Sequence, residues 1–198
     1  MRTIEIKLYN LHELSEDAQE KAFNDWSAKT EYLSHSENED TLNAFKQIFP
    51  VHITRYEYGL NRPCYINWEF TDDEHIKQLD GVRLIKYLWN NYQPVLYKPK
   101  FLYKGPIGVD SLTGYSKIQV EKSCNLTGYT ADIDMLEPFW EFMDGKGLYR
   151  DFKDLCNEAL ENWIDFCRKD MEDYFSFENF EFMASANEWE FDENGNLL

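Results

Sequence analysis

The side chains with the clearest chemical potential in this chain are carboxylates gathered near its C-terminal end. The candidate partner-binding residues are Asp154, Glu158, Glu161, Asp165, Glu172 and Asp173. The first five are separated by four, three, four and seven residues, which is the repeat of a helix, so they would share one helix face. Such a row either keeps the helix face solvated or binds a basic groove of a partner protein.

Two further pairs of carboxylates are candidates for metal-dependent or acid–base chemistry. Asp132 and Asp134 flank a single residue, a spacing that could begin a divalent-metal site but that also suits the start of a helix. Glu57 and Glu69 fall on two neighbouring predicted strands, where paired carboxylates could transfer protons. If the chain is an enzyme acting on nucleotides or nucleic acid, these pairs are its expected metal ligands.

The sequence contains no established catalytic motif. It has no HExxH, GxSxG, Walker A or GxGxxG segment, and its four histidines have no recognisable partner spacing. The four cysteines are far apart and form no CxxC pair, which favours reduced thiols in a cytosol. We therefore expect no catalytic residue, no bound metal and no cofactor.

Charge narrows the classes of partner. The 198 residues carry a net charge of −17, and residues 132–198 account for −14 of it, with 19 acids and 5 bases. Charge of this sign repels nucleic acid and anionic membranes, and no run of about 18 apolar residues could span a bilayer. A local exception is a group of lysines that either solvates strand edges or contacts phosphate: Lys98, Lys100, Lys104, Lys117 and Lys122.

The elements that must position these groups can be predicted from periodicity. Residues 3–9 alternate as a strand, and Ser15 can cap a helix with apolar residues every four positions. A second helix is expected over residues 39–49. Residues 52–58 and 64–70 alternate on either side of a glycine- and proline-containing turn, which predicts a hairpin.

The second half of the chain is predicted to be mainly helical. A helix is expected over residues 80–92, and residues 114–120 alternate as a strand. Asp134 is the expected cap of another helix, with Pro138 in its first turn. Residues 149–174 combine an apolar stripe with the acidic row, and a short strand is expected over residues 188–191.

These elements predict one fold class. We expect a single α+β domain over residues 1–198, with an antiparallel sheet, helices packed on one face of it, and a long, acidic, amphipathic C-terminal helix. The absence of a low-complexity linker favours one domain over two.

Three parts of the chain carry motifs that are specific as a set. They are residues 4–9 and 13–22 at the opening, residues 124–129 and 132–138 in the middle, and the acidic residues 186–195 at the close. Together they resemble a family of small acidic proteins carried by bacteriophages and other mobile elements of Firmicutes. The resemblance covers both ends and the C-terminal half of the chain but does not extend to the central region.

Members of that family are labelled antitoxin-like or hypothetical, and related mobile elements carry inhibitors of host defence, including anti-CRISPR proteins. The resemblance therefore implies a non-enzymatic inhibitor of a host defence nuclease. Because CRISPR effectors hold nucleic acid in positively charged channels, this agrees with the acidic row acting as a nucleic-acid mimic. Two alternatives stay open: an antitoxin or accessory protein that sequesters a cognate partner, and a metal-dependent enzyme.

Overall fold

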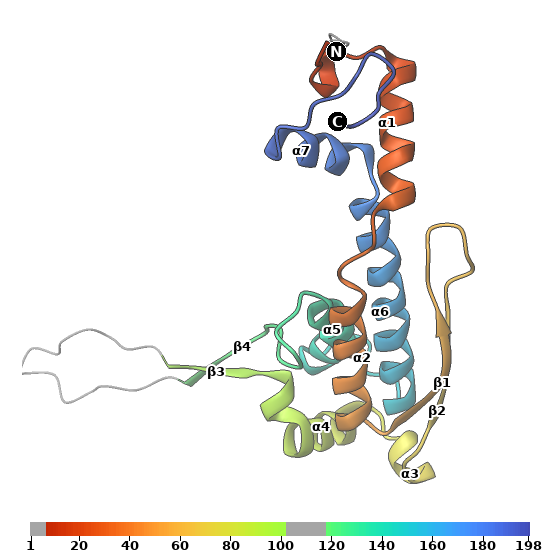
Figure 1. Cartoon of the computed structure of the whole chain (residues 1–198). Coiled ribbons are helices and arrows are strands. Elements are labelled where there is room, and N and C mark those ends of the chain that lie inside the picture. The colour runs from red at the N-terminus through yellow and green to blue at the C-terminus, as the bar shows by residue number, and fades with distance from the viewer. Residues whose placement is uncertain (1–6, 102–117) are drawn as a thin grey trace, which may run out of the picture. The chain divides into compact units, whose positions relative to one another are not determined.

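The computed structural model describes residues 7–101 and 118–198 (Figure 1). This part of the chain contains seven α-helices, one short 3-10 helix and two antiparallel pairs of strands, so it is mostly helical and belongs to the α+β class. Residue contacts divide the chain into two compact units. The terminal unit combines Met1–Leu33 with Lys169–Leu198, and the central unit comprises Ser34–Arg168. The expectation of a single domain stays a prediction.

The central unit is built from helices with two hairpins. Its elements are α2 (His35–Ile48), β1 (Val51–Glu57), β2 (Tyr65–Phe70), α3 (Glu74–Lys77), α4 (Gly81–Leu96), β3 (Lys98–Phe101), β4 (Ile118–Glu121), α5 (Ala131–Met143) and most of α6 (Phe152–Tyr174). The predicted helices and the predicted hairpin are confirmed, with boundaries shifted by a few residues. The short helix α3 was not expected.

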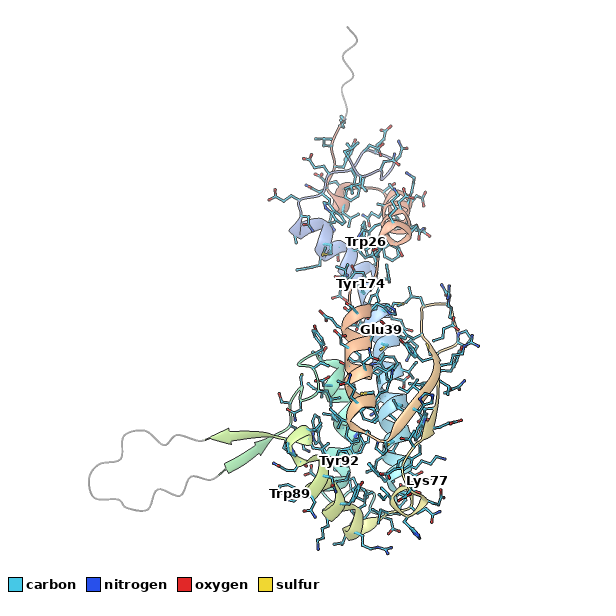
Figure 2. The ribbon with its side chains drawn as sticks, turned by 60° about the horizontal axis from the view of Figure 1, so that its bottom comes forward. Trp26, Glu39, Lys77, Trp89, Tyr92 and Tyr174 are labelled. Carbon is cyan, nitrogen blue, oxygen red and sulfur yellow. The ribbon has the colours of Figure 1, made fainter. Side chains whose placement is uncertain are left out.

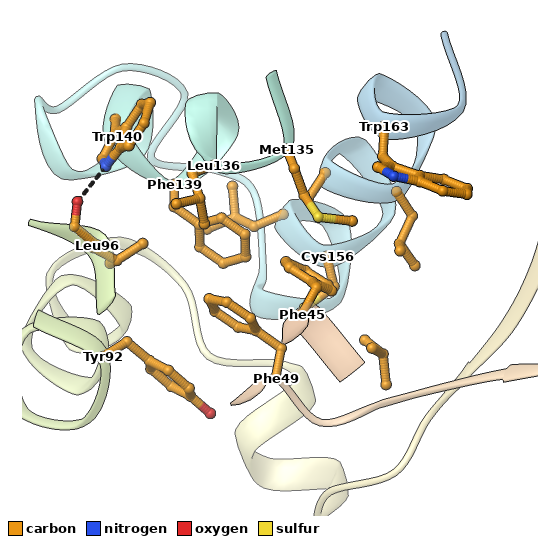
Figure 3. Close-up of a cluster of buried hydrophobic side chains, with 14 of the residues drawn as sticks. Phe45, Phe49, Tyr92, Leu96, Met135, Leu136, Phe139, Trp140, Cys156 and Trp163 are labelled. Atoms are coloured by element: carbon orange, nitrogen blue, oxygen red, sulfur yellow. Dashed lines mark hydrogen bonds between the residues drawn. The ribbon is translucent and has the colours of Figure 1, made fainter. Parts of the chain in front are cut away.

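Aromatic rings form the centre of this unit's core (Figure 3). The ring of Phe49 stacks on Tyr92 with centroids 4.8 Å apart, and it also lies 4.4 Å from Phe45 and 4.7 Å from Phe139. The indole N–H of Trp140, the polar group of this buried side chain, donates to the Leu96 carbonyl at 2.7 Å. Stacked rings bury large areas, so this cluster joins α2, α4 and α5.

The hairpin of β1 and β2 forms a sheet of only two strands, smaller than the sheet that we expected. Its register runs from Val51 opposite Phe70 to Glu57 opposite Tyr65, with an irregularity between Ile53 and Arg55. One face packs on the helical core, and Trp68 donates to the Asn157 side chain of α6 at 3.1 Å. The alternation in sequence therefore correctly identified the hairpin (Figure 1).

The start of α5 differs from the prediction. The helix begins at Ala131, after Thr130, so Asp134 is not its cap and Pro138 lies in its interior. Pro138 has no N–H to donate to the Asp134 carbonyl, which would leave that oxygen unpaired. Asn162 of α6 donates its side-chain amide to this carbonyl at 3.1 Å. A neighbouring helix thus makes an internal proline tolerable.

The terminal unit has a smaller core of its own. It contains η1 (Leu11–Glu13), α1 (Glu16–Lys29), the end of α6 and α7 (Phe177–Ala186), the last of which was not expected. Ser15 caps α1 as predicted, accepting from the Ala18 amide. The strands expected at both ends are reduced to an isolated bridge between Tyr9 and Phe191, and residues 3–6 lie outside the described residues.

A close contact at Gly195 fastens the C-terminal turn to α1. Gly195 has φ of +77°, and a Cβ built there would lie 2.1 Å from the Ala18 carbonyl oxygen. Gly145 has φ of +88° with nothing within 4 Å of a built Cβ. A side chain at either glycine would therefore meet the strain of a left-handed backbone, but only at Gly195 would it also clash with another part of the chain.

We expect Gly195→Ala to destabilise the protein more than Gly145→Ala. Gly145→Ala should cost about 1 kcal/mol for the left-handed backbone alone. Gly195→Ala should cost roughly 1–3 kcal/mol more, because α1 and the turn must separate. Urea denaturation of both variants would measure the difference, and equal losses would contradict this contact.

Candidate partner-binding surface

The acidic row lies on α6 as predicted, and its opposite face is the buried apolar stripe. Leu155, Ala159 and Trp163 are fully buried, whereas Asp154, Glu161 and Asp165 are exposed. The row therefore faces solvent because the other face of the helix is committed to the core.

Two of the carboxylates have structural roles in the central unit. Glu158 forms an ion pair with Arg150, whose side chain is only 11% exposed. Asp154 accepts from the Asp151 amide at 3.1 Å, and Asp151 accepts in return from the Asp154 amide at 2.8 Å. This reciprocal arrangement is a capping box that starts α6. The spacing of three between Asp151 and Asp154 could have predicted it.

The remaining carboxylates of the row are exposed. Glu161 accepts from the Asn157 side chain at 2.8 Å, and Asp165 lies 3.8 Å from the Arg168 guanidinium. Glu172 and Asp173 are exposed and follow Lys169, which places them in the terminal unit. A single surface made by all six carboxylates stays a prediction. In the central unit, Glu161 and Asp165 are exposed on α6, and a role for them in partner binding stays a prediction.

Asp132 has a structural role that sequence reasoning missed. It is fully buried, and its Oδ2 accepts from the backbone amides of Leu126, Thr127 and Gly128 at 2.8–3.0 Å. Its Oδ1 accepts from the hydroxyls of Thr127 and Thr41 at 2.8 and 3.1 Å. Both oxygens are thus occupied by donors that fix the loop before α5, and none of these contacts joins Asp132 to Asp134.

The second candidate pair is also separated. Glu69 lies opposite His52 in the hairpin, whereas Glu57 lies opposite Tyr65, four residues away along β2. At about 3.3 Å per residue this separates the two backbone positions by roughly 13 Å. Glu57 is held instead by Arg62 and the Tyr65 hydroxyl, each at 3.3 Å. The hairpin therefore does not pair these two carboxylates for proton transfer.

The lysine group can be placed only in part. Lys98 and Lys100 lie on β3, which pairs with β4, and Lys122 forms an ion pair with Asp144. Lys104 and Lys117 lie outside the described residues. A phosphate contact by this group stays a prediction, and for Lys122 it would have to compete with Asp144.

A connected cluster of polar side chains joins the start of α2 to the end of β1. The Tyr56 hydroxyl donates to Glu39 Oε1 at 2.7 Å, and His35 Nε2 lies 3.5 Å from the same oxygen. His35 Nδ1 lies 2.6 Å from the Tyr58 hydroxyl. Burial, and then the Glu39 carboxylate, raise the pKa of Tyr56 to about 12. The Tyr56 phenol therefore stays protonated and serves as a brace rather than as a base. Figure 2 labels Glu39 within this region.

None of the four cysteines, all of which lie in the described residues, forms a disulfide. Cys156 and Cys167 are buried on the apolar face of α6, and burial raises the pKa of the Cys156 thiol well above its usual range. Within residues 7–101 and 118–198, no three His, Cys, Asp or Glu side chains are grouped as metal ligands would be. No helix in that same part of the chain is long and apolar enough to cross a membrane.

Comparisons with known proteins add no relative to these observations. No protein-family model matches the chain, and searches of curated proteins and of solved structures also give no match. The resemblance to small acidic phage proteins therefore stays a prediction, and the surface must be interpreted from its own geometry.

We expect Asp132→Asn to destabilise the protein by about 3 kcal/mol, because an amide places donors against buried backbone N–H groups. Glu137→Gln makes the same chemical change at an exposed position of α5 and should stay within about 0.5 kcal/mol of the parent. Urea unfolding followed by circular dichroism measures both. A loss no larger than that of Glu137→Gln would show that Asp132 does not fix the loop.

A separate prediction concerns alkaline pH. The pKa of Tyr56 in the folded protein is about 12, above its ordinary value of 10.0. Stability from this raised pKa is fully present below pH 10 and is lost as the pH rises towards 12. Tyr56→Phe should therefore remove a phenol that titrates near pH 12 from the absorbance titration at 295 nm. It should also reduce the fall in the free energy of unfolding between pH 10 and pH 12. Tyr149→Phe, at an exposed site, is the matched control. A difference titration without a late step would contradict the brace.

Proposed function

We propose that this chain is a non-enzymatic protein that binds a basic, nucleic-acid-handling partner, as an inhibitor of the anti-CRISPR type encoded by a phage or mobile element. The observation that carries the proposal is the exposed acidic face of α6, backed by a helix face that is locked in the core. A rigid helix holds its charges in place before binding, so little ordering is required on association.

The density of charge on this face defines what kind of attraction it provides. Asp154 to Asp165 span eleven residues, or about 16 Å of helix. Four carboxylates over that length give one charge per about 5.5 Å, and about 8 Å once Glu158 is neutralised by Arg150. One DNA strand carries a charge per about 3.4 Å. The face is therefore sparser than a nucleic-acid strand, and it supports long-range attraction more than close mimicry.

The alternatives have less support in the geometry. The carboxylates that a metal-dependent enzyme would need do not converge on one point. Asp132 accepts hydrogen bonds from the amides of the loop before α5, and Glu57 lies far from Glu69 along the hairpin. No contact in the described residues favours an antitoxin over an inhibitor. An acidic face would attract a basic partner in either function. The choice of a defence nuclease as the partner therefore rests on the resemblance to phage proteins.

The test is inhibition of DNA cleavage by a panel of purified CRISPR effector nucleases. We expect the double variant Glu161→Lys/Asp165→Lys to inhibit at least tenfold less strongly than the parent, because it reverses the charge of the exposed face. We also expect wild-type inhibition to weaken as salt rises from 50 to 300 mM, because ions shorten the range of electrostatic attraction. Glu158 is left unchanged, since reversing it would place a second cation beside Arg150.

The matched control is Glu37→Lys/Asp40→Lys, which makes the same change in net charge at exposed positions of α2. It should inhibit within about twofold of the parent. Equal losses in both double variants would mean that net charge, and not the α6 face, matters. Failure to inhibit any nuclease of the panel would reject the function itself.

A further inference from the structure

The terminal unit contains a hollow of about 340 Å3 that the proposed function does not use. Its floor is mainly apolar and includes Trp26 of α1, Phe180 of α7 and Trp189 of the C-terminal tail. Its rim includes Asp25, Lys29 and Leu197. The volume lies within the range of about 300–1,000 Å3 that is usual for binding pockets.

Ring packing holds the floor of this hollow in place. Trp26 lies 5.3 Å from Phe180, and Phe180 lies 6.1 Å from Trp189, measured between ring centroids. Trp26 also stacks on Tyr174 (Figure 2). The Lys21 ammonium donates to the Asn194 carbonyl at 3.2 Å and so ties the tail to α1. The hollow is therefore formed before any ligand arrives.

The terminal unit that contains this hollow is strongly acidic. The terminal unit holds 16 acids and 5 bases, a net charge of −11, whereas the larger central unit holds 21 acids and 15 bases, a net charge of −6. Glu188 and Glu190 are exposed and flank Trp189 directly in the sequence. A surface of this sign repels nucleic acid, anionic membranes and a second copy of the chain, and it attracts a basic protein.

The chemistry of the rim decides which group enters the hollow. Asp25 and Lys29 carry opposite charges, and the Lys21 ammonium also lies 3.9 Å from Asp25, so the immediate rim offers no net negative charge to a cation. The floor, in contrast, offers aromatic surface. The hollow therefore suits an apolar side chain, whereas cations suit the acidic surface of the terminal unit outside the hollow.

We propose that the hollow binds an apolar side chain from a lysine- and arginine-rich segment of a partner protein, whose flanking cations face the carboxylates of the terminal unit. Leu197 and Leu198, 53% and 62% exposed, would gain cover from such a segment. This inference shares with the proposed function only the basic character of the partner, and it concerns a separate surface with its own test.

The test uses the full chain and the amidated peptide KKRLKRK, with affinity measured by fluorescence anisotropy and contacts by the indole N–H signals in NMR spectra. We expect the signals of Trp26 and Trp189 to shift and that of Trp89, which is exposed in the central unit, to stay in place. Replacing the leucine of the peptide by asparagine should weaken binding roughly tenfold or more, because the anchor is lost.

Protein variants separate the hollow from the charge around it. Thr30→Trp fills the hollow from its rim, and Ala28→Trp adds the same side chain at an exposed position of α1 that does not line the hollow. We expect about a tenfold loss of peptide affinity for the first and less than twofold for the second. Leu197→Asn provides a second change at an exposed lining residue, should Thr30→Trp fail to fold.

The outcomes decide the proposal independently of the function above. Equal binding of the leucine and asparagine peptides, or unchanged affinity in a folded Thr30→Trp or Leu197→Asn variant, overturns it. Glu161→Lys/Asp165→Lys should leave the peptide shifts at Trp26 and Trp189 unchanged, since these substitutions lie in the central unit. If peptide binding fails while that double variant still loses nuclease inhibition, the hollow is rejected and the proposed function stands.

Discussion

The central unit depends on the burial of one face of α6. Trp163 is fully buried there, donates its indole N–H to the Asn38 carbonyl of α2 at 3.0 Å, and packs edge-on against Tyr56 and Tyr58 of the hairpin region. Asn162 and Asn157 extend the same helix's contacts to α5 and β2. Because this face is committed to the core, the carboxylates on the other face must meet solvent. The surface proposed for a partner is thus a consequence of packing.

Buried polar groups explain where the fold departs from local sequence rules. A buried carboxylate is expensive unless its oxygens are satisfied, and five donors around Asp132 meet that requirement while fixing the loop before α5. Pro138 breaks the ladder inside α5, and Asn162 supplies the missing donor from another helix. The contact of Asn162 joins residues that are distant in sequence, whereas four of the five donors to Asp132 come from residues 126–128. The prediction of a cap at Asp134 considered neither arrangement and gave the wrong helix start.

The distribution of charge in the folded protein also differs from its distribution along the sequence. In sequence, residues 132–198 hold 19 acids and 5 bases. In the structure this segment is shared between two units, and its final part joins the acidic N-terminal end around an aromatic hollow. Arg150 neutralises Glu158, so the α6 row is weaker than its count of acids implied. The terminal unit, which periodicity described least well, carries the denser charge.

The sequence by itself determined the elements whose signals are local. Apolar residues at helical spacing identified α1, α2, α4 and α6, and alternation identified the hairpin of β1 and β2, because each pattern reflects which side of a regular element is buried. It also determined the exposed face of α6. Only the tertiary structure decided what the candidate carboxylates do: Glu158 pairs with Arg150, Asp132 fixes the loop before α5, and Glu57 and Glu69 are kept apart in the hairpin. Those outcomes depend on distances between segments, and a one-dimensional pattern contains no such distances.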